Sequence, residues 1–173
     1  PPLVGEGLGV RGKPKSAKIE ILLIAALLLA GFALRIENPG ALPVFQDETG
    51  HVSRADRVME FDHNPVGYGH GKLLFYYWLG LFAPEYTEAG LLTSRLAVAV
   101  LSLLGSAATF AAARSLFGRQ AAFFALTFVT FAPFTVFHDR MALADGPAGV
   151  MSALAAWSCV RMARRPTAAR GAW

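Results

Sequence analysis

The sequence predicts an all-α membrane protein, a polytopic helical bundle with interfacial helices in its first outer loop. Of the 173 residues, 54% are hydrophobic and only 16% are charged, against roughly 45–50% and 25% in soluble domains. Several runs reach 18 residues with almost no charge, which is about the length that crosses a bilayer. This composition excludes disordered, collagen, coiled-coil and nucleic-acid-binding classes. Membrane lipids are therefore expected partners, and nucleic acid is not.

Four segments are predicted to cross the membrane, and they share long apolar runs with small residues that let helices approach closely. They are residues 19–36, 91–114, 120–138 and 146–163. The first reaches about 27 Å at 1.5 Å per residue. The fourth is bounded by Asp145 and Arg161, and it spans only if Arg161 snorkels toward the headgroups or the helix continues to Ala163.

The distribution of basic residues predicts the orientation. Lys and Arg concentrate in residues 1–18, 115–119 and 164–173, which the positive-inside rule assigns to the cytoplasm. Residues 37–90 and 139–145 are then the outer loops. We expect a multi-pass bacterial cell-membrane protein with a cytoplasmic N-terminus. Because the chain starts at a proline and ends without a recognisable stop, we also expect it to be part of a longer protein.

The first outer loop is predicted to hold two interfacial helices. Apolar residues recur at helical spacing from Val52 to Met59, which indicates a short amphipathic helix. Residues 73–83 are rich in Phe, Tyr and Trp but too short to cross alone, as expected of a helix at headgroup level.

Adjacent carboxylates precede the amphipathic helix, at Asp47 and Glu48. Asp47 could simply be the N-cap, with Glu48 favoured by the positive helix end. The alternative is a general base held at the membrane surface and steadied by a neighbouring acid. Both readings can hold together. His51 follows one turn later on the same side of the membrane.

A second polar cluster follows the third predicted span, with His138 and Arg140 as candidate substrate-binding residues and Asp145 as a candidate catalytic acid. An arginine at the membrane edge can be a headgroup anchor, and Asp145 can cap the next helix. Four polar side chains within eight residues, Asp139 included, would nevertheless converge on the outer surface that also carries Asp47.

Lys72 precedes the aromatic helix, at the expected headgroup level. It could snorkel, or it could bind a lipid phosphate as a point charge. Histidines and carboxylates on the same side make a divalent metal conceivable, but no fixed ligand spacing supports one. The metal ligands are therefore unknown, and no cofactor is assigned.

Five motifs resemble the N-terminal part of GT-C membrane glycosyltransferases, in particular the dolichyl-phosphate-mannose protein mannosyltransferases and the lipid A aminoarabinose transferases. They span residues 45–51, 72–78, 95, 117–119 and 140–145. The resemblance implies an inverting transfer of a sugar from a polyprenyl-phosphate donor to a protein or lipid acceptor on the outer face. By this analogy Asp47, with Glu48 beside it, is a base or acceptor-orienting acid. Lys72 meets the carrier phosphate, and Asp145 is a further site acid.

The flanks of Lys72 depart from the transferase pattern, because Gly71 and Leu73 stand where the aminoarabinose transferases have Glu and Pro. Two other functions remain open. A subunit that translocates lipid-linked sugars without catalysis could carry the same outward cluster. An unrelated transporter fragment would place ionisable groups at mid-membrane, where the predicted spans hold none.

Overall fold

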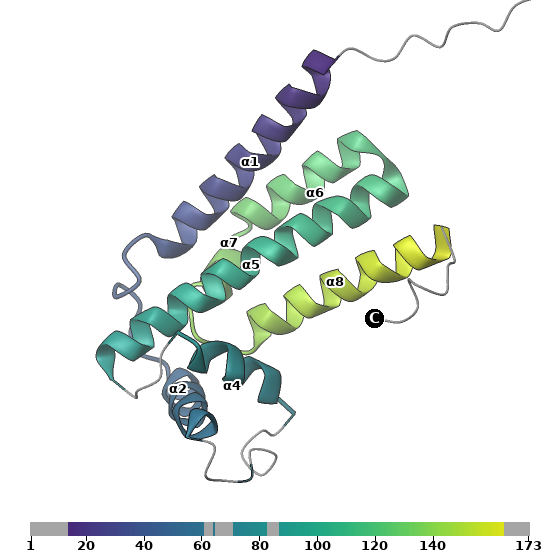
Figure 1. The fold of residues 1–173 in the computed structure, drawn as a ribbon. Helices are drawn as coiled ribbons and strands as arrows, with labels where there is room; N and C mark the ends of the chain where they lie inside the picture. Colours follow the sequence, from purple (N-terminus) through teal and green to yellow (C-terminus); the bar gives the residue numbers. More distant parts are fainter. Residues whose placement is uncertain (1–13, 61–63, 65–70, 83–86, 165–173) are drawn as a thin grey trace, which may run out of the picture.

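The computed structural model describes residues 14–60, 64, 71–82 and 87–164, so the predicted cytoplasmic segments 1–18 and 164–173 lie largely outside the described residues. In the described ranges every regular element is a helix, which confirms the expected all-α class (Figure 1). The helices are α1 (Pro14–Ile36), α2 (Gln46–Met59), α4 (Leu73–Gly80), α5 (Glu88–Phe117), α6 (Arg119–Phe131), α7 (Pro133–Asp139) and α8 (Asp145–Arg164).

Helix α5 is the centre of the bundle, where it contacts α1, α6 and α8. Figure 1 shows α2 and α4 beside one end of this bundle, together with the end of α1, the start of α5 and the start of α8. The segments 37–45 and 140–144 therefore lie at the same end of the molecule, as the predicted outer loops require.

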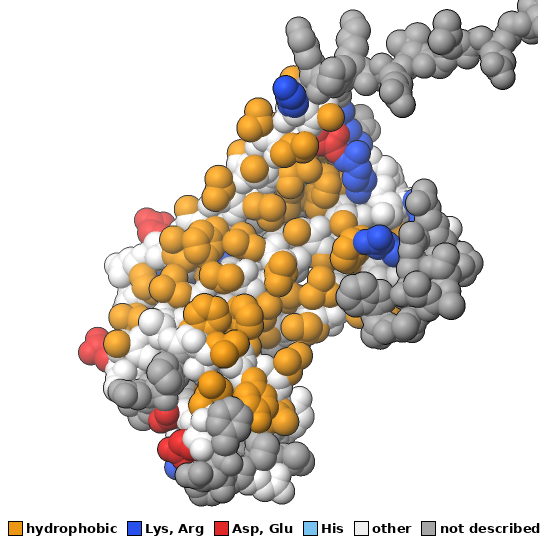
Figure 2. Space-filling view, in the orientation of Figure 1, with side chains coloured by type: hydrophobic (Ala, Val, Ile, Leu, Met, Phe, Trp, Pro, Cys, Tyr) orange, Lys and Arg blue, Asp and Glu red, His pale blue; other side chains and the backbone are white. Residues whose placement is uncertain are grey.

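The exposed surface is of the kind expected in a membrane protein. Two helical segments, Ala17–Ile36 and Glu88–Phe117, are long and apolar enough to cross a bilayer, and the α6–α7 pair gives a third if it is one bent span. Large apolar side chains are exposed on α1 and α6, with Leu22 at 67% and Phe124 at 78% (Figure 2). Such a surface is unfavourable in water and ordinary in lipid. The described part of α8 is not apolar enough over a membrane-spanning length to be counted with these segments, so its crossing stays a prediction.

The third predicted span is wrong as a continuous helix. Residues 120–138 form α6 and α7, which are bent by 57° at Ala132. Pro133 is the cause, because it lacks the N–H that would bind the carbonyl of Val129. Arg35 of α1 supplies the missing donors, since its Nη2 donates to Val129 O at 3.1 Å and its Nη1 to Thr130 O at 3.3 Å.

A buried ion pair also joins α1 to the end of α7. Arg35 Nε donates to Asp139 Oδ2 at 2.9 Å, and the Arg35 side chain is only 1% exposed. Arg35 lies in the last turn of α1. The pair fixes the direction in which the chain leaves α7 toward the second outer loop.

The opposite end of the bundle is basic. Arg114 and Arg119 both form ion pairs with Glu20 near the start of α1. The predicted turn 115–119 is shorter than expected, because α5 ends at Phe117 and α6 starts at Arg119 with Gly118 between them at φ 90°. Figure 2 shows Lys and Arg gathered at this end beside one acidic patch, and the other visible acidic side chains toward the opposite end. The orientation predicted from the charge distribution stays a prediction.

The two loop helices pack on each other and on α5. Ala55 and Val58 of α2, together with Tyr76 and Leu79 of α4, form a buried cluster with residues of α5. Trp78 Nε1 donates to a backbone carbonyl of α5, that of Ala97, at 3.0 Å. Both predicted loop helices are confirmed, although α2 starts six residues earlier than the apolar spacing suggested and α4 ends at residue 80.

Candidate functional site

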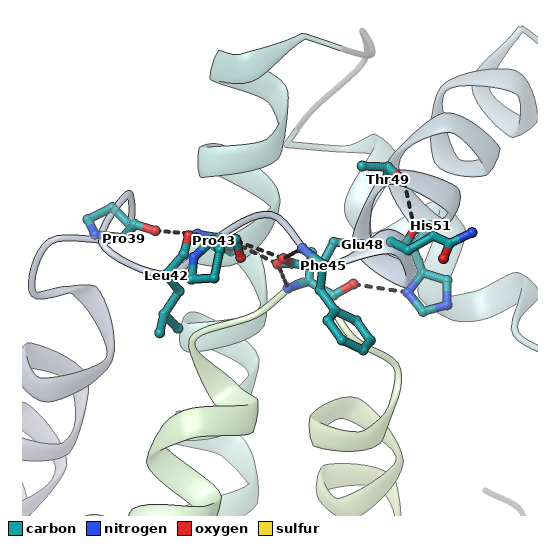
Figure 3. Close-up of polar contacts among 10 residues, drawn as sticks. Pro39, Leu42, Pro43, Phe45, Glu48, Thr49 and His51 are labelled. Carbon is teal, nitrogen blue, oxygen red and sulfur yellow. Dashed lines mark hydrogen bonds and ion pairs between the residues drawn. The ribbon is translucent and has the colours of Figure 1, made fainter.

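Glu48 is the centre of the polar network that joins the loops at residues 37–45 and 140–144 (Figure 3). Its carboxylate is fully buried and accepts from Arg95 Nε at 2.9 Å, Arg95 Nη2 at 2.7 Å and the backbone N of Ala142 at 2.7 Å. The backbone N of Phe45 completes the set at 3.1 Å. Glu48 therefore connects α2, α5 and the loops at residues 37–45 and 140–144.

Arg95 extends the same network into the first loop. Its guanidinium donates to the carbonyls of Pro39 at 2.5 Å, Leu42 at 3.0 Å and Pro43 at 3.2 Å, so the loop before α2 wraps around it (Figure 3). These three carbonyls lie in the loop between α1 and α2, outside any helix, and the arginine supplies their hydrogen-bond donors. The sequence motif around Arg95 gave no indication of this role.

The start of α2 corrects the expected cap. The N-cap is Phe45, so Asp47 lies inside the first turn instead of capping it. Glu48 is the acid that reaches back to the Phe45 amide, which is one half of a capping box. Burial raises the pKa of Glu48, but hydrogen bonds from Arg95, Ala142 and Phe45 outweigh it, so the pKa lies below its ordinary value. Glu48 is therefore ionised at neutral pH, and both of its carboxylate oxygens already accept hydrogen bonds.

Asp47 is the exposed member of the acid pair. It lies one turn before His51 on α2, and its carboxylate favours the charged form of that imidazole. His51 Nδ1 is 3.0 Å from the carbonyl of Ala142, and its Nε2 is 3.3 Å from Lys72 Nζ. The structure thus brings Asp47, His51 and Lys72 into one electrostatic cluster.

The two partners of His51 define its protonation. A carbonyl only accepts, so Nδ1 carries the proton and donates to Ala142, while Nε2 accepts from the Lys72 ammonium. Burial lowers the pKa of His51, and Lys72 lowers it further, against the opposing effects of Ala142 and Asp47. His51 is a neutral imidazole that holds the Lys72 amine in place.

A groove of about 440 Å³ lies between α4 and the first two turns of α8, and we call it the Lys72 groove. Lys72 and Asp145 are the charged residues that line it, and the remaining wall is mostly apolar. Leu74, Phe75 and Trp78 come from α4, whereas Pro147 and Met151 come from α8. The groove offers a cation, a carboxylate and a hydrocarbon surface together.

A second cavity of about 250 Å³ lies on the other side of α8, between α8, α5 and α7, and we call it the α7 crevice. His138 and Asp145 both line it. The His138 ring lies 4.4 Å from the Phe134 ring between centroids, and its Nδ1 is buried without a hydrogen-bond partner among the described residues. Asp145 is therefore common to both cavities.

Arg140 lies apart from both cavities. Its Nη2 donates to the carbonyls of Glu37 at 2.5 Å and Asn38 at 3.4 Å, so it joins the loop after α7 to the loop after α1. The predicted substrate contact of Arg140 stays a prediction.

In the described ranges, no three His, Cys, Asp or Glu side chains lie close enough together to hold one metal ion. Comparisons with protein-family models, curated proteins and solved structures find no match to this chain. The case for a function therefore depends on the geometry of this site.

Proposed function

We propose that the chain is the N-terminal membrane part of an inverting glycosyltransferase, which moves a sugar from a polyprenyl-phosphate donor to an acceptor on the outer face. The observation that carries this proposal is the Lys72 groove, where one lysine and one carboxylate lie at the edge of an apolar wall. A polyprenyl phosphate likewise combines a charged group with an apolar one, because its anionic phosphate is joined to a hydrocarbon chain.

Lys72 is suited to the phosphate. It is exposed, it is positioned through His51, and its ammonium has two further protons for phosphate oxygens. The aromatic and aliphatic side chains of α4 and α8 lie beside it for the first isoprene units. During transfer the bond from the sugar to the phosphate oxygen breaks, and a cation at that oxygen stabilises the developing charge.

Asp47 is suited to the proton of the acceptor. In an inverting transfer the acceptor hydroxyl attacks the anomeric carbon from the side opposite the phosphate and loses its proton to a base. Asp47 is the exposed acid of its pair, whereas the carboxylate of Glu48 already accepts four hydrogen bonds. In this mechanism Glu48 positions Asp47, and Asp145, which lines both cavities, orients the reacting groups.

Sugar transfer by the full-length protein in lipid vesicles tests the proposal. Asp47→Asn should lower kcat by about 10²- to 10⁴-fold, the usual contribution of a general base. Lys72→Gln should mainly raise the KM for the donor. Glu88→Gln and Lys18→Gln are the matched controls, because both residues are exposed and lie outside the Lys72 groove and the α7 crevice.

Unchanged turnover in Asp47→Asn would remove Asp47 from the mechanism. Absence of transfer by the wild-type protein, together with passage of labelled carrier across the bilayer, would instead favour translocation.

A further inference from the structure

His51 lies next to the Lys72 groove without being one of the described residues that line it. The histidine is only 4% exposed, and its ring packs against two side chains of α4, with centroids 5.3 Å from Phe75 and 5.9 Å from Tyr76. Nδ1 donates to the carbonyl of Ala142, and Nε2 accepts from Lys72 Nζ. His51 is therefore fixed in position, and it acts on a ligand in the groove through Lys72.

The charges around His51 keep its ring neutral while the groove is empty. Lys72 disfavours the charged imidazole, and so does Arg54 on the same helix, whereas Asp47 favours it. Asp145 is the other charged residue that lines the groove. Because Lys72 and Asp145 carry opposite charges, the described lining of the empty groove has no net charge.

The other elements that pack near His51 add few titratable groups. On α4 the nearest one is the hydroxyl of Tyr76. Arg95 of α5 is paired with Glu48, and Arg140, in the loop that carries Ala142, donates to the loop after α1. These two cations are thus directed at other partners, and a new charge at Lys72 would act on His51 with little competition.

A phosphate bound to Lys72 would lie close to His51. Nζ is 3.3 Å from Nε2, and an ammonium group holds a phosphate oxygen at about 2.8 Å. The phosphate oxygen therefore lies at most about 6 Å from Nε2. An anion at that distance favours the charged imidazole by the same Coulomb interaction that lets Lys72 disfavour it.

We infer that His51 is a positioning residue that is neutral while the Lys72 groove is empty and takes up one proton when a carrier phosphate binds, a conclusion that rests on the proposed function. In the empty groove, the lone pair of Nε2 holds one N–H of Lys72. Once a proton from the solvent occupies Nε2, this nitrogen donates, and Lys72 turns all three of its protons toward phosphate oxygens.

The added cation matches the change of charge during transfer. The donor is a phosphodiester with one negative charge, whereas the carrier that remains is a phosphomonoester with about one charge more. The bond from the anomeric carbon to the phosphate oxygen breaks with its electron pair on that oxygen. The acceptor oxygen bonds to the same carbon, and its proton passes to Asp47. His51 keeps its own proton, so the imidazolium and Lys72 together stabilise the leaving phosphate.

Isothermal titration calorimetry on the full-length protein in lipid nanodiscs tests this inference. The probe is polyprenyl methyl phosphate, because this phosphodiester keeps one negative charge near neutral pH. Titrations in buffers of different ionisation enthalpy give the number of protons taken up per bound carrier. The control is polyprenol of the same chain length, which has no phosphate and should take up no proton.

The wild-type protein should take up more than about half a proton per carrier at about pH 6.5. Its affinity for the probe should rise about tenfold as pH falls from about 8 toward the native pKa of His51, because the pKa increases by about one unit on binding. The sign follows from linkage, since the bound state holds the proton more tightly.

His51→Gln separates the proton from the hydrogen bond. The glutamine amide oxygen can accept from Lys72, but the amide does not titrate. The variant should bind the probe like the wild type at about pH 8, lose the proton uptake and show a flat pH profile. Lys18→Gln, an exposed change at the far end of α1, should keep both properties of the wild type.

The inference is overturned if the wild-type protein binds the probe without proton uptake, or if His51→Gln takes up the same number of protons. Histidine nitrogen NMR of the wild-type complex gives a reading that needs no variant, because a neutral His51 ring with carrier bound at about pH 6.5 would also overturn it. Proton-coupled carrier binding without any sugar transfer would overturn the proposed function alone. Failure to bind any polyprenyl phosphate would overturn both.

Discussion

Replacing Glu48 with glutamine should destabilise the protein far more than replacing its neighbour Asp47 with asparagine. Glutamine keeps the shape of the side chain but exchanges one acceptor oxygen for an amide group that donates. Glu48 now accepts four hydrogen bonds, two of them from Arg95. In the variant, the glutamine amide N–H faces N–H groups that now donate to Glu48, and the buried guanidinium of Arg95 loses this counterion.

The expected magnitude follows from that geometry. Removing one partner of a buried ion pair costs about 3–5 kcal/mol, and the complete burial of Glu48 places this pair in that class. Asp47 is exposed, so Asp47→Asn should change the free energy of unfolding by about 0.5 kcal/mol or less. Titration with SDS in mixed micelles, followed by circular dichroism, measures both values.

The two variants should separate stability from activity. Asp47→Asn should unfold like the wild type and lose transfer, whereas Glu48→Gln should lose stability first. Equal unfolding free energies for the two variants, within about 0.5 kcal/mol, would refute the structural role of Glu48.

Three further predictions concern the helix break, the α5–α8 contact and His51. Arg35→Met should cost about 3–5 kcal/mol in the same SDS titration, and adding Asp139→Leu should recover part of the loss, because the second change removes the unpaired acid. Gly105→Ala should cost about 1–3 kcal/mol, since its Cβ would lie 2.8 Å from an α8 side chain, whereas Gly149→Ala should stabilise by up to about 1 kcal/mol. The pKa of His51 is lowered in the native state, so the unfolded chain binds a proton at this histidine before the folded chain does as pH falls below 6.5. The free energy of unfolding should therefore decrease from pH 6.5 down to the native pKa. Histidine nitrogen NMR at pH 6.5 should show His51 neutral with its proton on Nδ1, and a charged ring would contradict this.

Local patterns were enough to predict the helical class and both loop helices. Hydropathy identified α1 and α5, and apolar spacing identified α2. The break between α6 and α7 was missed because a count of uncharged residues does not register that Pro133 removes a backbone donor.

The candidate site shows a different limit. Neighbouring acids on a helix point about 100° apart, so only one of Asp47 and Glu48 can face inward, but their sequence does not say which. The answer depends on Arg95, which lies 47 residues away from Glu48. Likewise, one sequence alone gives no sign that Arg35 meets Asp139 across 104 residues.

Side-specific cysteine labelling tests most directly whether the site residues share one face. Asp47→Cys, Lys72→Cys and Asp145→Cys are made singly in a protein whose Cys159 is replaced by serine, with Lys18→Cys as the control from the other end of α1. A membrane-impermeant thiol reagent applied to intact cells should label positions 47, 72 and 145, and should label position 18 only after lysis. Labelling of positions 47 and 145 from opposite sides would contradict the proposed site.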